Sequence, residues 1–127
     1  PNTNAQGAEP KFSDGKVSSL FGTHDDPRFY QVNVPLQPGN SGGALVNDSG
    51  LAIGMIAFHQ NDLKTSKPPG PLTQNLNYAL KSSQIAAFLS GIPEARVKIP
   101  LQQPTKRSYK DAIKAAQSAT VLILVHQ

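Results

Sequence analysis

The run Pro38-Gly39-Asn40-Ser41-Gly42-Gly43 decides how this chain of 127 residues is interpreted. A serine lies between glycines, and the apolar run Ala44-Leu45-Val46 follows at once. A nucleophilic hydroxyl must stand on a tight turn, with backbone N–H groups directed at the oxyanion that forms beside it. Gly39 suits such a turn because glycine adopts backbone conformations that other residues avoid. A glycine-rich hairpin turn is the alternative, but this order of residues before an apolar strand favours a nucleophile loop.

Short strand patterns surround this run. The alternation of Tyr30, Val32 and Val34 with polar residues predicts a half-buried strand just before it. Asn47-Asp48-Ser49-Gly50 is a strong turn signal between two apolar stretches and predicts a hairpin. The predicted strands cover residues 16–21, 29–34, 43–47, 51–58 and 76–80, and a helix capped by Ser82 or Ser83 follows them. Short strands separated by turns at this spacing indicate an all-β barrel or sandwich.

The last part of the chain differs in composition. Residues 94–107 contain two prolines and are predicted to form a linker. Ser108 begins a pattern like a capping box, with Asp111 in place of Glu or Gln, and predicts a helix to about residue 118. Val121–Val125 is the most apolar run and is predicted to be a strand buried on both faces. The predicted organisation is therefore one unit at 1–93 and a linker with a helix–strand extension at 94–127.

The run around Ser41 resembles the nucleophile loop of the trypsin-like (chymotrypsin-fold) serine peptidases. It is most similar to their bacterial HtrA-type branch, in which Pro-Gly-Asn-Ser-Gly-Gly is typical. The predicted strands resemble those of the family's C-terminal barrel, over roughly residues 1–93. The resemblance implies a mainly β fold: an antiparallel Greek-key barrel that lacks its first strand, with two short helices and a C-terminal extra strand.

The same resemblance implies roles for particular residues. Ser41 would be the nucleophile, and the backbone N–H groups of Gly39 and Ser41 would form the oxyanion hole. The implied substrate-binding residues are Pro35, Leu36, Ile56 and Leu76 in the specificity pocket, and Ala57, Phe58 and His59 along the substrate backbone. No pocket residue is charged, which favours a small or apolar substrate side chain. Plain core positions are the alternative for Leu36, Ile56 and Leu76, because pockets and cores use the same residue types.

A serine hydroxyl also needs an adjacent base and an orienting carboxylate. In the family, a His and an Asp come from a first barrel, which we expect before this chain. The chain is thus expected to be the C-terminal half of a serine endopeptidase, inactive alone. His24, His59 and His126 are weaker alternatives for the base. Two other hypotheses stay open: a non-catalytic module of the same fold that binds peptides by strand addition, and a structural domain whose serine turn is a relic.

Composition weighs against other classes of protein. The chain has no cysteine, and its three histidines are far apart, so no disulfide and no metal site are predicted. No cofactor is expected. No apolar run of about 18 residues occurs, so no membrane span is predicted. The net charge of +4 arises after residue 93. Without interleaved aromatic residues, this charge favours a solvated surface over nucleic-acid binding.

Two partners are expected. One is a peptide or protein substrate, and the other is the N-terminal barrel that would supply the His and Asp of the triad. A barrel without its first strand has unpaired edges, and Val121–Val125 is predicted to pair with one of them, in its own chain or in a strand-swapped homodimer. A bacterial source is expected, and the compartment (periplasmic, secreted or cytoplasmic) is left open.

Overall fold

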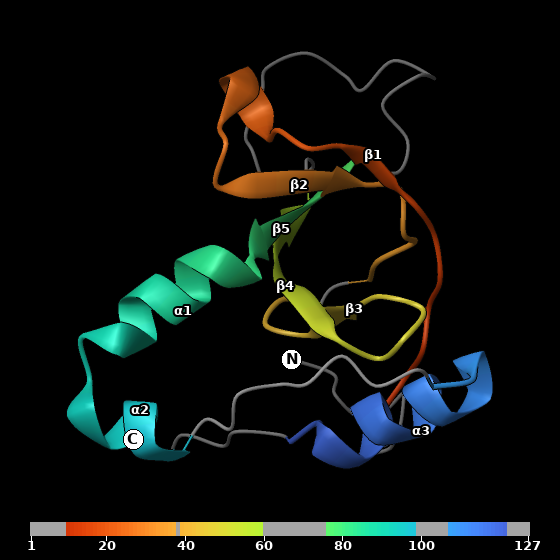
Figure 1. The fold of residues 1–127 in the computed structure, drawn as a ribbon. Helices are drawn as coiled ribbons and strands as arrows, with labels where there is room; N and C mark the ends of the chain where they lie inside the picture. Colours follow the sequence, from red (N-terminus) through yellow and green to blue (C-terminus); the bar gives the residue numbers. More distant parts are fainter. Residues whose placement is uncertain (1–9, 38, 60–75, 99–106, 122–127) are drawn as a thin grey trace, which may run out of the picture.

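A computed structural model describes residues 10–37, 39–59, 76–98 and 107–121 (Figure 1). Their centre is one five-stranded antiparallel sheet with the strand order β1-β2-β5-β4-β3. The strands are β1 (Val17–Ser19), β2 (Phe29–Val32), β3 (Ala44–Val46), β4 (Ala52–His59) and β5 (Asn77–Lys81). All five lie within the predicted stretches or within one residue of them, so the mostly β fold is confirmed.

The core lies where β2, β5 and β4 pair. Val32 and Ala79 have no exposed surface, and Ile56 and Tyr78 are nearly as buried. Val32 is paired with Asn77, and Ile56 with Ala79, so β5 is the central strand. The predicted alternation along β2 is only partly followed, because Gln31 is half-buried beside its partner on β5.

The expected Greek-key barrel, which was predicted to lack its first strand, is not confirmed among the described residues, because the sheet does not close. Figure 1 shows the sheet turning from β1 and β2 at the top to β4 and β3 below, but its two ends do not meet. In the described part of the chain, β1 pairs only with β2, and β3 only with β4. The sheet is therefore open, with one strand edge unpaired at each end.

Three α-helices follow the sheet, where two were expected: α1 (Ser82–Ser90), α2 (Pro93–Lys98) and α3 (Tyr109–Ala119). Helix α1 packs against β4 and β5. Its N-cap is Lys81 and not Ser82 or Ser83, and no side chain caps it. The prediction that a linker starts at residue 94 is wrong for its first residues, because residues 94–98 belong to helix α2. Proline at the first helical position and Glu94 in the first turn favour this helix.

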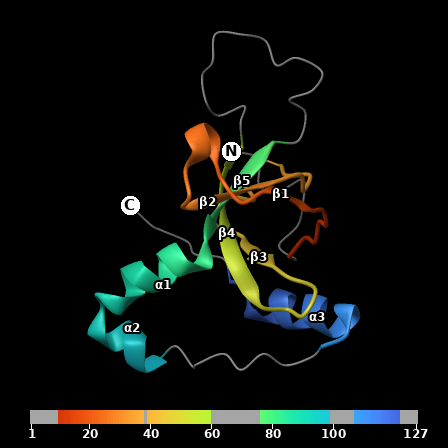
Figure 2. The same cartoon turned by 45° about the horizontal axis from the view of Figure 1, so that its top comes forward.

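Helix α3 lies beside the β3–β4 hairpin in both Figure 1 and Figure 2. Its predicted cap is confirmed, because the Ser108 hydroxyl accepts a hydrogen bond of 3.2 Å from the Asp111 N–H. Ala112 is the buried residue of α3 and lies against Gly50 in the hairpin turn. Tyr109 packs edge-on against Phe12, with ring centroids 6.1 Å apart. The helix is thus in contact with the sheet domain.

The predicted last strand is only partly covered by the structure. Val121 is not in a strand and is 78% exposed. Residues 122–127, which hold the rest of that prediction and His126, lie outside the described residues.

Candidate active site

Two successive four-residue turns form the loop that carries Ser41. The Asn40 N–H donates to the Gln37 carbonyl at 3.1 Å, and the Gly43 N–H donates to the Asn40 carbonyl at 3.0 Å. The third residue of each turn is a glycine with positive φ, +98° at Gly39 and +88° at Gly42. A third residue with φ near +80° is the mark of a type II turn and requires glycine or asparagine. The glycine pattern of the sequence therefore sets the shape of this loop.

Ser41 is the second residue of the second turn and is exposed. A Cβ atom placed on Gly39 or Gly42 would meet nothing within 4 Å, so both flanks of the serine are open. In the described part of the chain, no acceptor contacts the N–H of Gly39 or of Ser41. A hydroxyl with open flanks and unengaged neighbouring N–H groups is accessible to an incoming carbonyl group.

The end of this loop is fastened to β4. The Gly42 N–H donates to the Ile56 carbonyl at 2.8 Å, and the Ile56 N–H donates to the Gly43 carbonyl at 2.8 Å. These bonds extend the β3–β4 ladder up to the serine turn. A Cβ atom on Gly43 would lie 2.9 Å from the Asn40 carbonyl oxygen, so this turn cannot accept a larger residue unchanged.

The start of the loop is held by side chains. Asn33 accepts from the Lys16 N–H at 2.6 Å and donates its own N–H to the Lys16 carbonyl at 3.0 Å. The carbonyl of the next residue, Val34, accepts from the side-chain amide of Asn77. Asn77 is fully buried. The role of Asn77 was not predicted from the sequence. The one sequence signal for it is that a polar residue occurs within an otherwise apolar predicted strand.

The residues predicted to bind substrate divide into two sets. Ile56 is buried and touches the serine loop through its backbone, and Leu36 and Leu76 are half-buried. Pro35 is exposed in the segment that leads to the loop. The other set is the end of β4, residues 57–59. Ala57 is a half-buried bulge residue, since Ile56 is paired with Ala79 and Phe58 with Tyr78. The side chains of Phe58 and His59 lie outside the described structure, so pocket membership remains a prediction.

His24 and His59 are the alternative bases whose backbone the structure describes. His24 is in the short helix η2 (Thr23–Asp25), which precedes the start of β2. The chain leaves for Ser41 from the opposite end of β2 (Figure 1). His59 ends β4, beyond Ile56, and its side chain is not described. Among the described residues, no cluster of three His, Asp or Glu side chains could hold a metal ion.

The one ion pair among the described residues lies close to η2. The Arg28 guanidinium donates to the Asp26 carboxylate, with a shortest distance of 2.7 Å. The Asp26 carboxylate also accepts from the Arg28 backbone N–H at 3.0 Å. These hydrogen bonds lower the pKa of Asp26 from 3.8 to about 2. The pair fixes the turn before β2.

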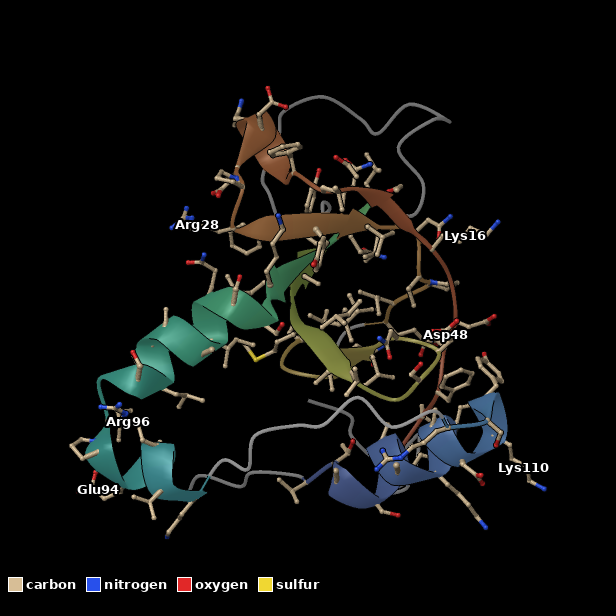
Figure 3. All side chains as sticks on the ribbon, viewed as in Figure 1. Lys16, Arg28, Asp48, Glu94, Arg96 and Lys110 are labelled. Carbon is tan, nitrogen blue, oxygen red and sulfur yellow. The ribbon has the colours of Figure 1, made fainter. Side chains whose placement is uncertain are left out.

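Figure 3 shows Arg96 on α2 and Lys110 on α3 at opposite sides of the molecule. These two basic residues therefore do not belong to one patch. No described helix is long and apolar enough to cross a lipid bilayer.

Comparison with known proteins supports a trypsin-like peptidase domain in this chain. The family model described as "Trypsin-like peptidase domain" matches residues 2–55, a stretch that includes the serine loop and the first half of β4. A protein of Sinorhizobium fredii, named "Uncharacterized protein y4bJ", is 40% identical over 78 residues. The match covers 61% of this chain and 12% of that protein, so the chain corresponds to a small part of this relative. No solved structure gives a significant match.

Proposed function

We propose that this chain is the C-terminal barrel of an HtrA-type, trypsin-like serine endopeptidase, with Ser41 as its nucleophile. One observation carries the proposal: Ser41 stands exposed between two glycines of positive φ, beside N–H groups that no described residue engages. The match of the peptidase family model to this part of the chain supports the reaction class.

The reaction needs two steps at Ser41. Its Oγ bonds to the carbonyl carbon of the scissile peptide while its proton passes to a base. The C–N bond then breaks, and the leaving amine takes up that proton. Water next attacks the acyl ester, which releases the acid and restores the hydroxyl group. The Gly39 and Ser41 N–H groups would donate to the oxyanion formed in each step.

The base and its orienting carboxylate would come from an N-terminal barrel outside these 127 residues. The open sheet supports this part of the proposal, because β1 and β3 each have an unpaired edge that a further strand could occupy. A strand from the upstream barrel segment is our preferred occupant. Val121–Val125 of the same chain or of a second copy is the alternative, and most of that run lies outside the described residues.

The substrate would bind along the end of β4. In the described structure, Ile56 is the last residue of β4 that bonds to the serine loop, so residues 57–59 have no recorded partner on that side. A peptide could add there as a strand, with its scissile carbonyl close to Ser41. The pocket proposed from Pro35, Leu36, Ile56 and Leu76 has no charged side chain, so small or apolar residues should be preferred before the cleaved bond.

The test is hydrolysis of short peptides by the chain joined to its upstream barrel. Peptides with Ala, Val or Leu before the cleaved bond should be cut faster than those with Arg or Lys. Ser41→Ala should lower turnover by about 10⁴- to 10⁶-fold, because the covalent path is lost. Ser83→Ala changes an exposed serine on α1 and should leave turnover unchanged. Equal turnover by wild type and Ser41→Ala would refute the proposed nucleophile.

The side of residues 57–59 that has no partner among the described residues also suits a non-catalytic peptide-binding module of the same fold. In that case the joined protein would bind the same peptides without cutting them, and Ser41→Ala would not change the affinity or the lifetime of the peptide. Calorimetry with wild type and Ser41→Ala distinguishes this function from catalysis.

A further inference from the structure

Asn77 is a polar side chain at a fully buried position of the sheet. It begins β5, the central strand, and has no exposed surface. Its Nδ2 donates a 2.5 Å hydrogen bond to the carbonyl of Val34, a residue 43 positions earlier in the chain. Burying an amide is unfavourable unless it forms hydrogen bonds, so this residue needs a specific partner to be tolerated there.

The Val34 carbonyl needs a donor because of where β2 ends. Val32 is the last residue of β2 and is paired with Asn77. Two residues later the chain has left the ladder, and Val34 is still 93% buried. A buried carbonyl without a donor costs roughly 1–3 kcal/mol. The Asn77 amide therefore takes the place of the missing strand neighbour.

This hydrogen bond ties the segment before Ser41 to β5. Beyond the serine, the pair of bonds between Ile56 and the Gly42–Gly43 backbone ties the loop to β4. Ile56 is paired with Ala79, two residues after Asn77 on the same strand. The loop that carries the serine is thus tied at both ends to neighbouring positions of β4 and β5.

We propose that Asn77 is a positioning residue for the Ser41 loop: through Val34 it fixes where the loop leaves the sheet, and so where the hydroxyl and the Gly39 N–H lie. Its catalytic consequence rests on the function proposed above. Asn77 itself touches neither substrate nor the reacting atoms. It acts through the backbone of Val34, and a displacement of about 1 Å at a reacting group can cost up to about 100-fold in rate.

Asn77→Asp is the sharpest variant, because it keeps the size of the side chain and, with the carboxyl group ionised, removes the donor, so it is measured at a pH high enough to ionise that group. Asn33→Asp is its matched control. The chemical change is the same and lies one residue from Val34, but Asn33 Oδ1 is an acceptor for the Lys16 N–H, a role that a carboxylate keeps. Val32→Ala is the second control, because it weakens the core beside Asn77 without removing a hydrogen bond.

The first measurement needs no enzyme activity. In the 127-residue chain, amide hydrogen exchange of residues 39–43 should speed up at least about 10-fold in Asn77→Asp relative to wild type. The exchange rate of these residues should change little in Asn33→Asp. In Val32→Ala it should rise only as much as the loss in free energy of unfolding of the whole chain accounts for. The proposal would be overturned if the faster exchange in Asn77→Asp were fully accounted for by its loss in free energy of unfolding, as expected for Val32→Ala.

The second measurement uses the chain joined to its upstream barrel. Asn77→Asp should lower kcat by about 10- to 100-fold and leave KM within about twofold, because the nucleophile is displaced while the binding edge of β4 is kept. Asn33→Asp should keep both constants. A kcat as high as that of wild type in Asn77→Asp would overturn the positioning role. If wild type itself is inactive, the proposed function fails, and the exchange measurement still decides the role of Asn77.

Discussion

At the scale of single residues, backbone geometry decides whether Ser41 can act. The glycines at 39 and 42 have φ values of +98° and +88°, where other residues are strained by about 1–2 kcal/mol. These positions were predictable, because glycine on each side of a serine is a local pattern. The hydrogen bond from Asn77 to Val34 was not predictable in this way. It joins residues 43 positions apart and depends on the register of β2 against β5.

The Asp26–Arg28 pair gives a prediction on pH dependence. The pKa of Asp26 in the folded chain is about 2, below the ordinary value of 3.8. The pair therefore stabilises the fold fully above pH 3.8, and this contribution is lost as the pH falls towards 2. Asp26→Asn should melt at a lower temperature than wild type at pH 6, and the two melting temperatures should converge near pH 2.

Thermal unfolding followed by circular dichroism across this pH range measures the difference. Asp48→Asn is the control, since Asp48 is exposed at the hairpin turn and makes no ion pair in the described part of the chain (Figure 3). A constant gap between Asp26→Asn and wild type from pH 6 to pH 2 would mean that the carboxylate charge is not the cause.

At the scale of elements, most of the sheet was predictable from the sequence and the helices less so. The five strands were found because apolar stretches are separated by strong turn residues, such as Asn47 and Gly50. Asn47 confirms this reading, because its side-chain oxygen accepts from the N–H groups of Ser49 and Leu51. Helix α2 was not predicted, because the two prolines within residues 94–107 indicated a linker, whereas Pro93 favours the first position of a helix.

The contact between α3 and the hairpin turn gives the second prediction. Gly50 has φ +81°, and a Cβ atom there would lie 3.2 Å from both Cα and Cβ of Ala112. Gly50→Ala should destabilise the chain by the left-handed strain of about 1–2 kcal/mol and also push α3 away. Gly39→Ala is the control, because its φ is also positive but its surroundings are open.

Urea unfolding and limited proteolysis of residues 108–120 measure these two effects. Both variants should lose stability, and only Gly50→Ala should expose the α3 segment to the protease. Equal protection of α3 in the two variants would show that the helix does not depend on this contact.

At the scale of the whole molecule, the sheet formed by the described residues is open. The sequence resemblance predicts unpaired edges, because the first strand of the family's second barrel is expected upstream of this chain. The open sheet of the described residues agrees with that expectation, and the Greek-key barrel itself is not confirmed. The central claim is that Ser41 is a nucleophile that becomes reactive only with that upstream barrel.

Labelling with a serine-directed phosphonate, located by peptide mass spectrometry, tests this claim most directly. The 127-residue chain alone should remain unlabelled, because proton transfer from Ser41 lacks a base. The chain joined to its upstream barrel should take up one equivalent on Ser41, and Ser41→Ala should take up none. Stoichiometric labelling of Ser41 in the isolated chain would contradict the account and point to a local base such as His59. Failure to label the joined protein would contradict the assignment of Ser41 as the nucleophile.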